Sequence, residues 1–305
     1  MTTFYPIGTP GRPWEAAELA AWRARQSRLR SYALDVTPRL ERLAPDFERL
    51  DYGHLDYAGE TFALVALRSR DWDPKKPAAL ITGGVHGYET SGVMGAIAFM
   101  EERALAYASA VNLFVAPCVS PWAYERINRW TYDALDPNRN FRANSPCGEA
   151  ASLIRLVEPY LGQFLVHIDL HETTDSDESE FRRALAARDG TPFQPGLIPD
   201  GFYAVADAEN LQLPFQEAII AAVERVTHIA PADDAGEIIG CPVLSRGVIA
   251  YPLSAYGMCP SITGARYTTT TEVYPDSPRA SPQQCNAAQV AAVQAALDFA
   301  LGAAR

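Results

Sequence analysis

The chain has 305 residues, of which 48% are apolar and 21% are charged, a balance that allows a sizeable buried core. This length suits one large α/β domain or two small ones. The formal net charge is −11, and an acidic surface repels phosphate backbones, so we expect no nucleic-acid partner. A small anionic substrate stays compatible with this charge, because a few arginines in a cleft can reverse the local potential.

No stretch of the sequence approaches the roughly 18 continuous apolar residues of a membrane span, and we expect no membrane partner. Residues 1–14 carry proline and glycine where a secretory signal would need an apolar core. The five cysteines are odd in number and lack C-x-x-C spacing, which is typical of reduced thiols. These features predict a cytoplasmic protein and leave its oligomeric state open.

The first predicted element in chain order is an amphipathic helix over residues 15–32, with Leu19, Trp22, Leu29 and Tyr32 on one side. Short apolar or β-branched runs predict the strands that follow. These strands are expected at 48–55, 61–67, 78–82, 111–117 and 163–170, with a further strand at the threonine run 268–271. Apolar residues at helical spacing predict helices at 91–104, 150–161, 215–228 and 284–301.

Strands that alternate with helices indicate an α/β fold, in which a mostly parallel or mixed twisted central sheet is flanked by helices on both faces. We find no internal repeat and no low-complexity linker. The segment 187–201 is rich in Pro, Gly and Asp and predicts a loop. The sequence therefore predicts a single domain over residues 1–305.

Candidate metal ligands follow two of the predicted buried strands. His86 and Glu89 lie on a glycine-rich turn after the strand at 78–82, and His171 follows the strand at 163–170. Two histidines and one glutamate form an established ligand set for catalytic zinc, which keeps a fourth position open for water. By itself, His-x-x-Glu is also compatible with a histidine at a helix start beside a glutamate that the helix dipole favours.

A second polar segment, residues 136–141, places Arg139 between two asparagines and follows Arg126 and Arg129. The guanidinium group presents a planar fork that matches a carboxylate, and a neighbouring asparagine adds a donor. The alternative for such a segment is a solvated polar loop. Its place between the proposed ligands favours the capture of an anion.

Four motifs occur in a fixed order: Gly-x-His-Gly-x-Glu at 84–89, Asp-Pro-Asn-Arg-Asn-Phe at 136–141, Asp-Leu-His at 169–171, and a glutamate ending the threonine run at 268–272. In this order they resemble the zinc metallocarboxypeptidase superfamily. That superfamily includes the digestive carboxypeptidases and the succinylglutamate desuccinylase/aspartoacylase branch. The resemblance covers most of the chain and implies the zinc carboxypeptidase fold and one Zn²⁺ per chain.

The resemblance also implies roles for single residues. His86, Glu89 and His171 match the zinc ligands, and Glu272 matches the general base. Asn138 and Arg139 match the pair that binds the free carboxylate of the substrate. Arg129 matches the arginine that stabilises the carbonyl oxygen as it becomes an oxyanion, and Arg126 is its substitute.

Other residues are placed by the strand pattern and by departures from the family. Asp169 shares a strand face with His171 and is expected either to orient that ligand or to make a structural hydrogen bond. His167 is expected in the core, because four residues of strand separate it from His171 by ~13 Å. Glu172 is expected on the opposite side of the strand, and His54 and His228 at the surface or in packing.

The family places a mobile tyrosine upstream of the base. Tyr251 and Tyr256 are available for that role, and Tyr256 is assigned to substrate binding here, although packing is the alternative for both. The family also carries Asn-Pro before the arginine segment, where this chain has Ser120 and Pro121. This departure affects the expected shape of the pocket beside Arg129, not the metal.

We therefore expect a zinc-dependent hydrolase that cleaves an amide bond next to a free carboxylate, as a carboxypeptidase acting on small peptides. An N-acyl amino acid deacylase is the alternative, since both reactions need the Arg139 clamp. The 136–141 string resembles the peptidase branch, and the Asp-Leu-His string the deacylase branch. Two further hypotheses are a non-catalytic binding member of the fold and a serine or cysteine hydrolase, although the sequence has no G-x-S-x-G elbow.

Overall fold

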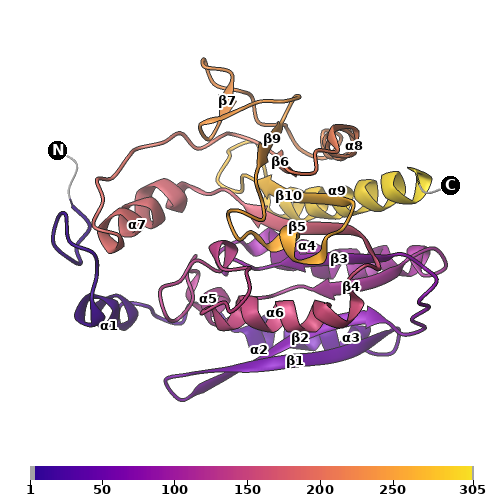
Figure 1. Ribbon diagram of the computed structural model, residues 1–305, viewed down its shortest axis with the longest axis horizontal. Helices are drawn as coiled ribbons and strands as arrows, with labels where there is room; N and C mark the ends of the chain where they lie inside the picture. Colours follow the sequence, from indigo (N-terminus) through magenta and orange to yellow (C-terminus); the bar gives the residue numbers. More distant parts are fainter. Residues whose placement is uncertain (1–3, 304–305) are drawn as a thin grey trace.

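The computed structural model describes residues 4–303, so the first three residues of the N-terminal segment and the last two of the predicted domain lie outside it. An eight-stranded sheet in the order β1-β2-β4-β3-β5-β10-β6-β9 forms the centre of the molecule (Figure 1). Its strands are β1 (Phe47–Tyr57), β2 (Glu60–Ser69), β3 (Ala78–Gly83), β4 (Asn112–Ala116), β5 (Phe164–Glu172), β6 (Tyr203–Asp207), β9 (Val248–Tyr251) and β10 (Tyr267–Val273).

The sheet is mixed. The four central strands β4, β3, β5 and β10 run parallel, β1 and β2 pair antiparallel at one edge, and β6 runs antiparallel to β10. Every residue of β3 and β4 is buried, as the uninterrupted apolar runs predict for strands covered on both faces. The predicted single α/β domain with a mostly parallel or mixed sheet is confirmed.

Helices cover both faces of the sheet. The larger core lies between the sheet and α2, α3, α4, α8 and α9, and a second core lies under α6 on the opposite face (Figure 1). The helices are α1 (Ala16–Ala24), α2 (Tyr32–Asp35), α3 (Thr37–Leu43), α4 (Thr90–Glu102), α5 (Pro121–Arg126), α6 (Gly148–Val157), α7 (Arg182–Arg188), α8 (Leu213–Val223) and α9 (Pro282–Ala303). A small hairpin of β7 (Glu237–Ile238) and β8 (Cys241–Pro242) stands apart from the sheet.

The order of the strands creates a switch point beside β3. The chain passes from β3 through α4 to β4 on one side, and from β4 through α6 to β5 on the other side of β3. Because these two crossovers place β4 and β5 on opposite sides of β3, a crevice is expected at the carboxyl ends of β3 and β5, and residues that follow both strands line a cavity there. These ends carry the residues expected to bind metal.

The helix predicted over residues 15–32 is wrong in its length. The structure has α1 up to Ala24 and only resumes a helix at α2. Between them, the backbone N–H groups of Leu29 and Arg30 donate to the carbonyl of Glu125 at the end of α5, at 2.8 and 3.2 Å. This tertiary contact replaces the helical hydrogen bonds and leaves the Leu29 side chain exposed.

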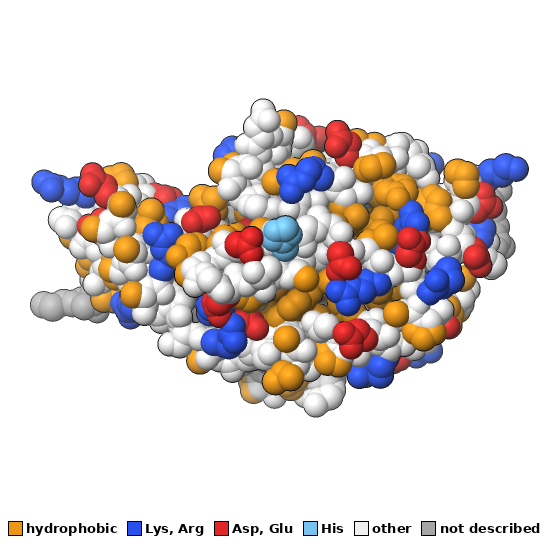
Figure 2. Space-filling view, turned by 90° about the horizontal axis from the view of Figure 1, so that it is seen from below, with side chains coloured by type: hydrophobic (Ala, Val, Ile, Leu, Met, Phe, Trp, Pro, Cys, Tyr) orange, Lys and Arg blue, Asp and Glu red, His pale blue; other side chains and the backbone are white. Residues whose placement is uncertain are grey.

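Charged side chains of both signs are interspersed over the face of the molecule seen from the β1 side (Figure 2). None of the helices within residues 4–303 combines the length and the apolar character that a membrane span requires. The five cysteines are free thiols, four of them buried, in agreement with their interpretation as reduced residues.

Candidate metal centre

A tight loop after β3 brings two of the expected ligands to the crevice. The loop runs from Gly84, whose φ of +58° favours glycine, to the start of α4 at Thr90. The carbonyls of Gly83 and Gly84 accept hydrogen bonds from the N–H groups of Val119 and Ser120 at 3.0 and 2.9 Å, which tie the loop to the segment after β4.

The three expected ligands converge. Ligand atoms of His86, Glu89 and His171 all lie within 4.8 Å of one another, and the three residues are at most 2% exposed. Nδ1 of His86 lies 2.7 Å from Oε1 of Glu89, and Nδ1 of His171 lies 2.6 Å from Oε2. Among residues 4–303, Oε2 nevertheless accepts no hydrogen bond, which leaves this buried oxygen able to bind a metal ion.

A carboxylate holds the far nitrogen of each imidazole. Nε2 of His86 lies 2.9 Å from Oδ1 of Asp136, and Nε2 of His171 lies 2.6 Å from Oδ2 of Asp169. An Nε2–H group that donates to a carboxylate leaves the lone pair of Nδ1 free for a metal ion, as is usual for histidine ligands. The contact expected between Asp169 and His171 is therefore present, and the matching role of Asp136 was missed although the residue lies in the 136–141 motif.

The cluster fits a divalent cation. Burial lowers the pKa of His171, but Asp169 and Glu89 outweigh burial and raise it well above its usual range. The negative charge of these two buried carboxylates therefore favours a positive charge at this position. Two imidazole nitrogens and one carboxylate match the donor set of catalytic zinc, with room for a further ligand on the side of the cavity.

Glu272 lies beside this cluster because β10 pairs with β5. The parallel register places Glu272 opposite His171, and the hydroxyl of Thr173 donates to Oε2 of Glu272 at 3.0 Å. Burial raises the pKa of Glu272 to about 8, although His171 lowers it. A cation at the cluster would lower this pKa further, since positive charge favours the carboxylate. The threonine run thus forms the predicted strand and delivers a carboxylate to the crevice.

Arg129 also lines the cavity. Its Nε donates to Oδ2 of Asp136 at 3.1 Å, so one carboxylate joins this arginine to His86. Nη1 donates to the hydroxyl of Tyr88 and to Oδ1 of Asp177, each at 3.1 Å. Among residues 4–303, Nη2 has no hydrogen-bond or ion-pair partner.

Asn138 and Arg139 lie together on the short turn Pro137–Arg139. Oδ1 of Asn138 accepts from the N–H of Cys259 at 2.8 Å, which fixes this buried side chain with Nδ2 at 3.4 Å from Nε2 of His171. Arg139 is exposed to the cavity, and its Nη1 donates to the carbonyl of Asn138 at 2.8 Å. No acidic side chain of residues 4–303 forms an ion pair with Arg139, so the guanidinium N–H groups that do not donate to Asn138 are available to a ligand.

Two sequence-based assignments do not agree with the structure. Arg126 forms ion pairs with Glu60 and Glu125 and stacks on Trp122, away from the cavity, so it is no substitute for Arg129. Tyr256 is 46% exposed and does not line the cavity. Its ring packs 5.7 Å from that of Tyr251, and Tyr251 is the tyrosine that reaches the cavity wall.

The remaining polar residues near the ligands have structural contacts. Glu172 accepts from the N–H groups of Thr90 and Ser91 at 3.0 and 2.7 Å and so caps α4, and burial raises its pKa to about 7. His167 is fully buried, and burial lowers its pKa to about 4, as expected for a core histidine. His54 is exposed, while His228 pairs with Asp200 at 2.9 Å.

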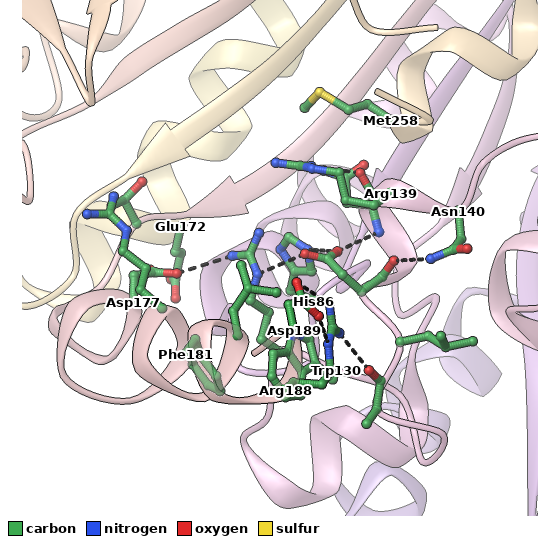
Figure 3. Close-up of a pocket in the computed structure, with 18 of the residues that line it drawn as sticks. His86, Trp130, Arg139, Asn140, Glu172, Asp177, Phe181, Arg188, Asp189 and Met258 are labelled. Carbon is green, nitrogen blue, oxygen red and sulfur yellow. Dashed lines mark hydrogen bonds and ion pairs between the residues drawn. The ribbon is translucent and has the colours of Figure 1, made fainter. Parts of the chain in front are cut away.

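A cavity of about 600 Å³ is lined by His86, Glu272 and the polar side chains of Arg129, Asn138 and Arg139. Arg139 and Met258 lie on one side of His86, and Phe181 and Trp130 lie on the other (Figure 3). The cavity therefore extends from Arg139 past His86 to Phe181, which directly precedes α7.

Comparison of the sequence with protein-family models and with curated proteins finds no match. The structure is similar to a candidate metallopeptidase from Shewanella baltica OS155, with a TM-score of 0.65, 19% identity, and coverage of 95% of this chain and 99% of that one. It is also similar to carboxypeptidase A from Helicoverpa armigera, with a TM-score of 0.59, 12% identity and coverage of 96% and 75%.

A third similar structure is the metallo-carboxypeptidase from Pseudomonas aeruginosa in complex with (2-guanidinoethylmercapto)succinic acid, with a TM-score of 0.55, 14% identity and coverage of 95% and 70%. At these identities the similarity concerns the fold. The chain has the fold of the metallopeptidases and metallocarboxypeptidases, in agreement with the resemblance that its motifs carry.

Proposed function

We propose that this chain is a zinc-dependent hydrolase that cleaves an amide bond next to a free carboxylate, as a carboxypeptidase acting on small peptides. The observation that carries the proposal is the convergence of His86, Glu89 and His171 beside Glu272, in a cavity that also presents an arginine without an acidic partner, Arg139. A non-catalytic binding protein would not need a further carboxylate, Glu272, beside the candidate metal ligands.

Each residue has a defined task in this reaction. His86, Glu89 and His171 would hold Zn²⁺, and the bound ion would supply Lewis acidity that lowers the pKa of water and polarises a carbonyl group. Glu272 takes the proton from the attacking water and passes it to the leaving nitrogen as the amide C–N bond breaks. Nη2 of Arg129 donates to the carbonyl oxygen as negative charge develops on it, which stabilises the transition state more than the ground state.

Arg139 and Asn138 select the bond that is cleaved. A carboxylate held by the Arg139 fork fixes the distance from the substrate terminus to the metal cluster, so that only the adjacent amide bond reaches it. The metallo-carboxypeptidase from Pseudomonas aeruginosa is bound to a succinic acid derivative, a ligand with carboxylate groups. A similar group would meet Arg139 in this chain.

An N-acyl amino acid deacylase would use the same clamp, and the Asp-Leu-His motif favours that second candidate. The deciding experiment combines the metal content of the purified protein with hydrolysis of blocked dipeptides and of N-acyl amino acids. About one zinc per chain, with turnover lost on chelation and restored by Zn²⁺, would support the hydrolase, and the preferred panel would identify the branch. A metal-free protein whose activity is indifferent to chelator would overturn it.

A matched pair of variants tests the clamp. Arg139→Met should raise KM by about 100-fold or more, because the substrate carboxylate loses a charge-assisted bidentate partner. Arg142→Met changes an exposed arginine of the same segment outside the cavity and should leave KM unchanged. Equal KM values for both variants would rule out Arg139 as the carboxylate site.

A further inference from the structure

The guanidinium group of Arg129 donates to two carboxylates, through Nε and through Nη1. The carboxylate that binds Nη1 belongs to a residue outside the four sequence motifs. That residue is Asp177, whose Oδ1 lies 3.1 Å from Nη1 of Arg129. With Nε fixed by Asp136 and Nη1 fixed by Asp177, the plane of the guanidinium group is determined, and only Nη2 is left for a ligand.

Asp177 is itself firmly anchored. Its Oδ2 accepts from the backbone N–H of Thr174 at 2.8 Å, and the hydroxyl of Tyr88 lies 2.8 and 2.9 Å from its two oxygens. The residue is only 8% exposed. A carboxylate held by a backbone group and by a buried phenol keeps one position, and therefore fixes the position of whatever it binds.

The local backbone explains why this carboxylate reaches Arg129. Residues Asp177–Phe181 form a turn of π-helix before α7, a rare conformation that is frequent at functional sites. The segment follows directly from β5, which carries His171. Arg129 is thus tied to the His171 segment through Asp177 and to His86 through Asp136.

We propose that Asp177, assisted by Tyr88, is a positioning residue that aims Nη2 of Arg129 at the carbonyl oxygen of the scissile bond. This inference rests on the proposed function and deepens it. Without Asp177, Arg129 keeps its contact with Asp136 but can rotate about it. A misplacement of about 1 Å at a reacting centre costs on the order of 100-fold in rate.

The test is a double-mutant cycle on zinc-loaded protein, with the best substrate of the panel above. Asp177→Ala should lower kcat by about 30- to 100-fold with KM within about threefold, because Arg129 acts in the transition state. In an Arg129→Ala background, the same change should have no further effect on kcat. Tyr88→Phe should give a smaller loss, and Asp175→Ala, an exposed neighbour outside the cavity, should give none.

Two readouts separate positioning from a structural role. Zinc content and melting temperature of Asp177→Asn, which keeps the shape of the side chain, should match those of the wild type while kcat falls. Added guanidinium should restore turnover to Arg129→Ala, and should fail to do so in Arg129→Ala/Asp177→Ala, where its anchor is missing.

The outcomes are distinguishable. Wild-type kcat for Arg129→Ala would remove the oxyanion role of Arg129 from the proposed function. A slow Arg129→Ala enzyme with an unchanged kcat for Asp177→Ala, or with equal losses from Asp177→Ala in both backgrounds, would overturn the positioning role alone. Loss of zinc from Asp177→Asn would likewise assign Asp177 to the structure of the metal site and overturn the inference.

Discussion

Three glutamates lie in the site, Glu89 and Glu172 buried and Glu272 partly exposed, and their neighbours give each a different chemistry. Glu89 faces two imidazoles, Glu172 caps α4 through two backbone N–H groups, and Glu272 accepts a single hydroxyl and faces the cavity. Only a carboxylate with a free lone pair at the cavity can accept a proton from water. Glu272 is therefore the base that this arrangement offers.

Glu272→Gln should keep zinc and lose turnover by about 10³-fold. The amide still accepts from Thr173, so the strand is preserved, but it cannot take a proton. Metal analysis and kcat measured on the same sample check this expectation. His171→Ala is the contrasting variant and should lose both zinc and turnover. Wild-type rates for Glu272→Gln would refute the role of Glu272 as base.

At the scale of single residues, the sequence predicts the candidate metal ligands better than the residues that position the other side chains of the site. His86, Glu89 and His171 stand out because their types and spacing match a metal site. Asp177 carries no such signal, since its contact with Arg129 depends on a π-helical turn and on residues 48 positions apart in the chain. The exposed position of Tyr256 likewise depends on the loop after β9, which no local pattern specifies.

At the scale of elements, the loop that carries His86 and Glu89 is packed against α5 without spare room. An ideal Cβ built on Gly87 would overlap the backbone of Ala123 and Tyr124. The carbonyl of Gly87 also accepts from the guanidinium of Arg30 at 2.5 Å. The loop can therefore hold the two ligands in place only while residue 87 has no side chain.

Gly87→Ala should displace the loop and weaken zinc binding by at least about tenfold, since metal affinity depends on the orientation of the ligands. Competition with a chromophoric chelator measures the affinity, and thermal unfolding verifies that the variant folds. Gly302→Ala is the control, because a Cβ there meets no atom within 4 Å. An unchanged zinc affinity for Gly87→Ala would show that the loop adapts without moving its ligands.

At the scale of the whole molecule, the strands of the sheet centre were the easiest part to predict. The buried runs at β3, β4 and β5 and the threonine run at β10 have strong local signals, and the order of these strands places the site at their carboxyl ends. Strands β6 and β9 were missed, because each has at most five residues and is stabilised by its neighbours in the sheet.

Glu149 is a buried acidic residue whose protonation affects the stability of the whole protein. Its carboxyl group is fully buried at the start of α6, with the hydroxyl of Tyr57 at 3.1 Å and the thiol of Cys147 at 3.4 Å. Burial raises its pKa to about 7 from the ordinary value of 4.5. The folded protein therefore keeps a proton that the unfolded chain has lost between about pH 4.5 and 7.

The sign of the effect follows from the proton count. Because the folded state binds more protons in this window, the free energy of unfolding contributed by Glu149 falls as the pH rises from 4.5 to 7 and is constant above it. Glu149→Gln removes this dependence. Between pH 4.5 and 8, the free energy of unfolding of the variant should rise relative to that of the wild type by on the order of 3 kcal/mol. This figure follows from about 1.4 kcal/mol per unit of pKa difference.

Urea unfolding at a series of pH values, with chelator present so that metal binding does not contribute, measures this difference. The raised pKa values of Glu172 and Glu272 affect both proteins and cancel in the comparison. Glu102→Gln removes one exposed charge and corrects for the change in net charge. Parallel stability curves for Glu149→Gln and the wild type would mean that Glu149 ionises in the folded protein as it does in the unfolded chain.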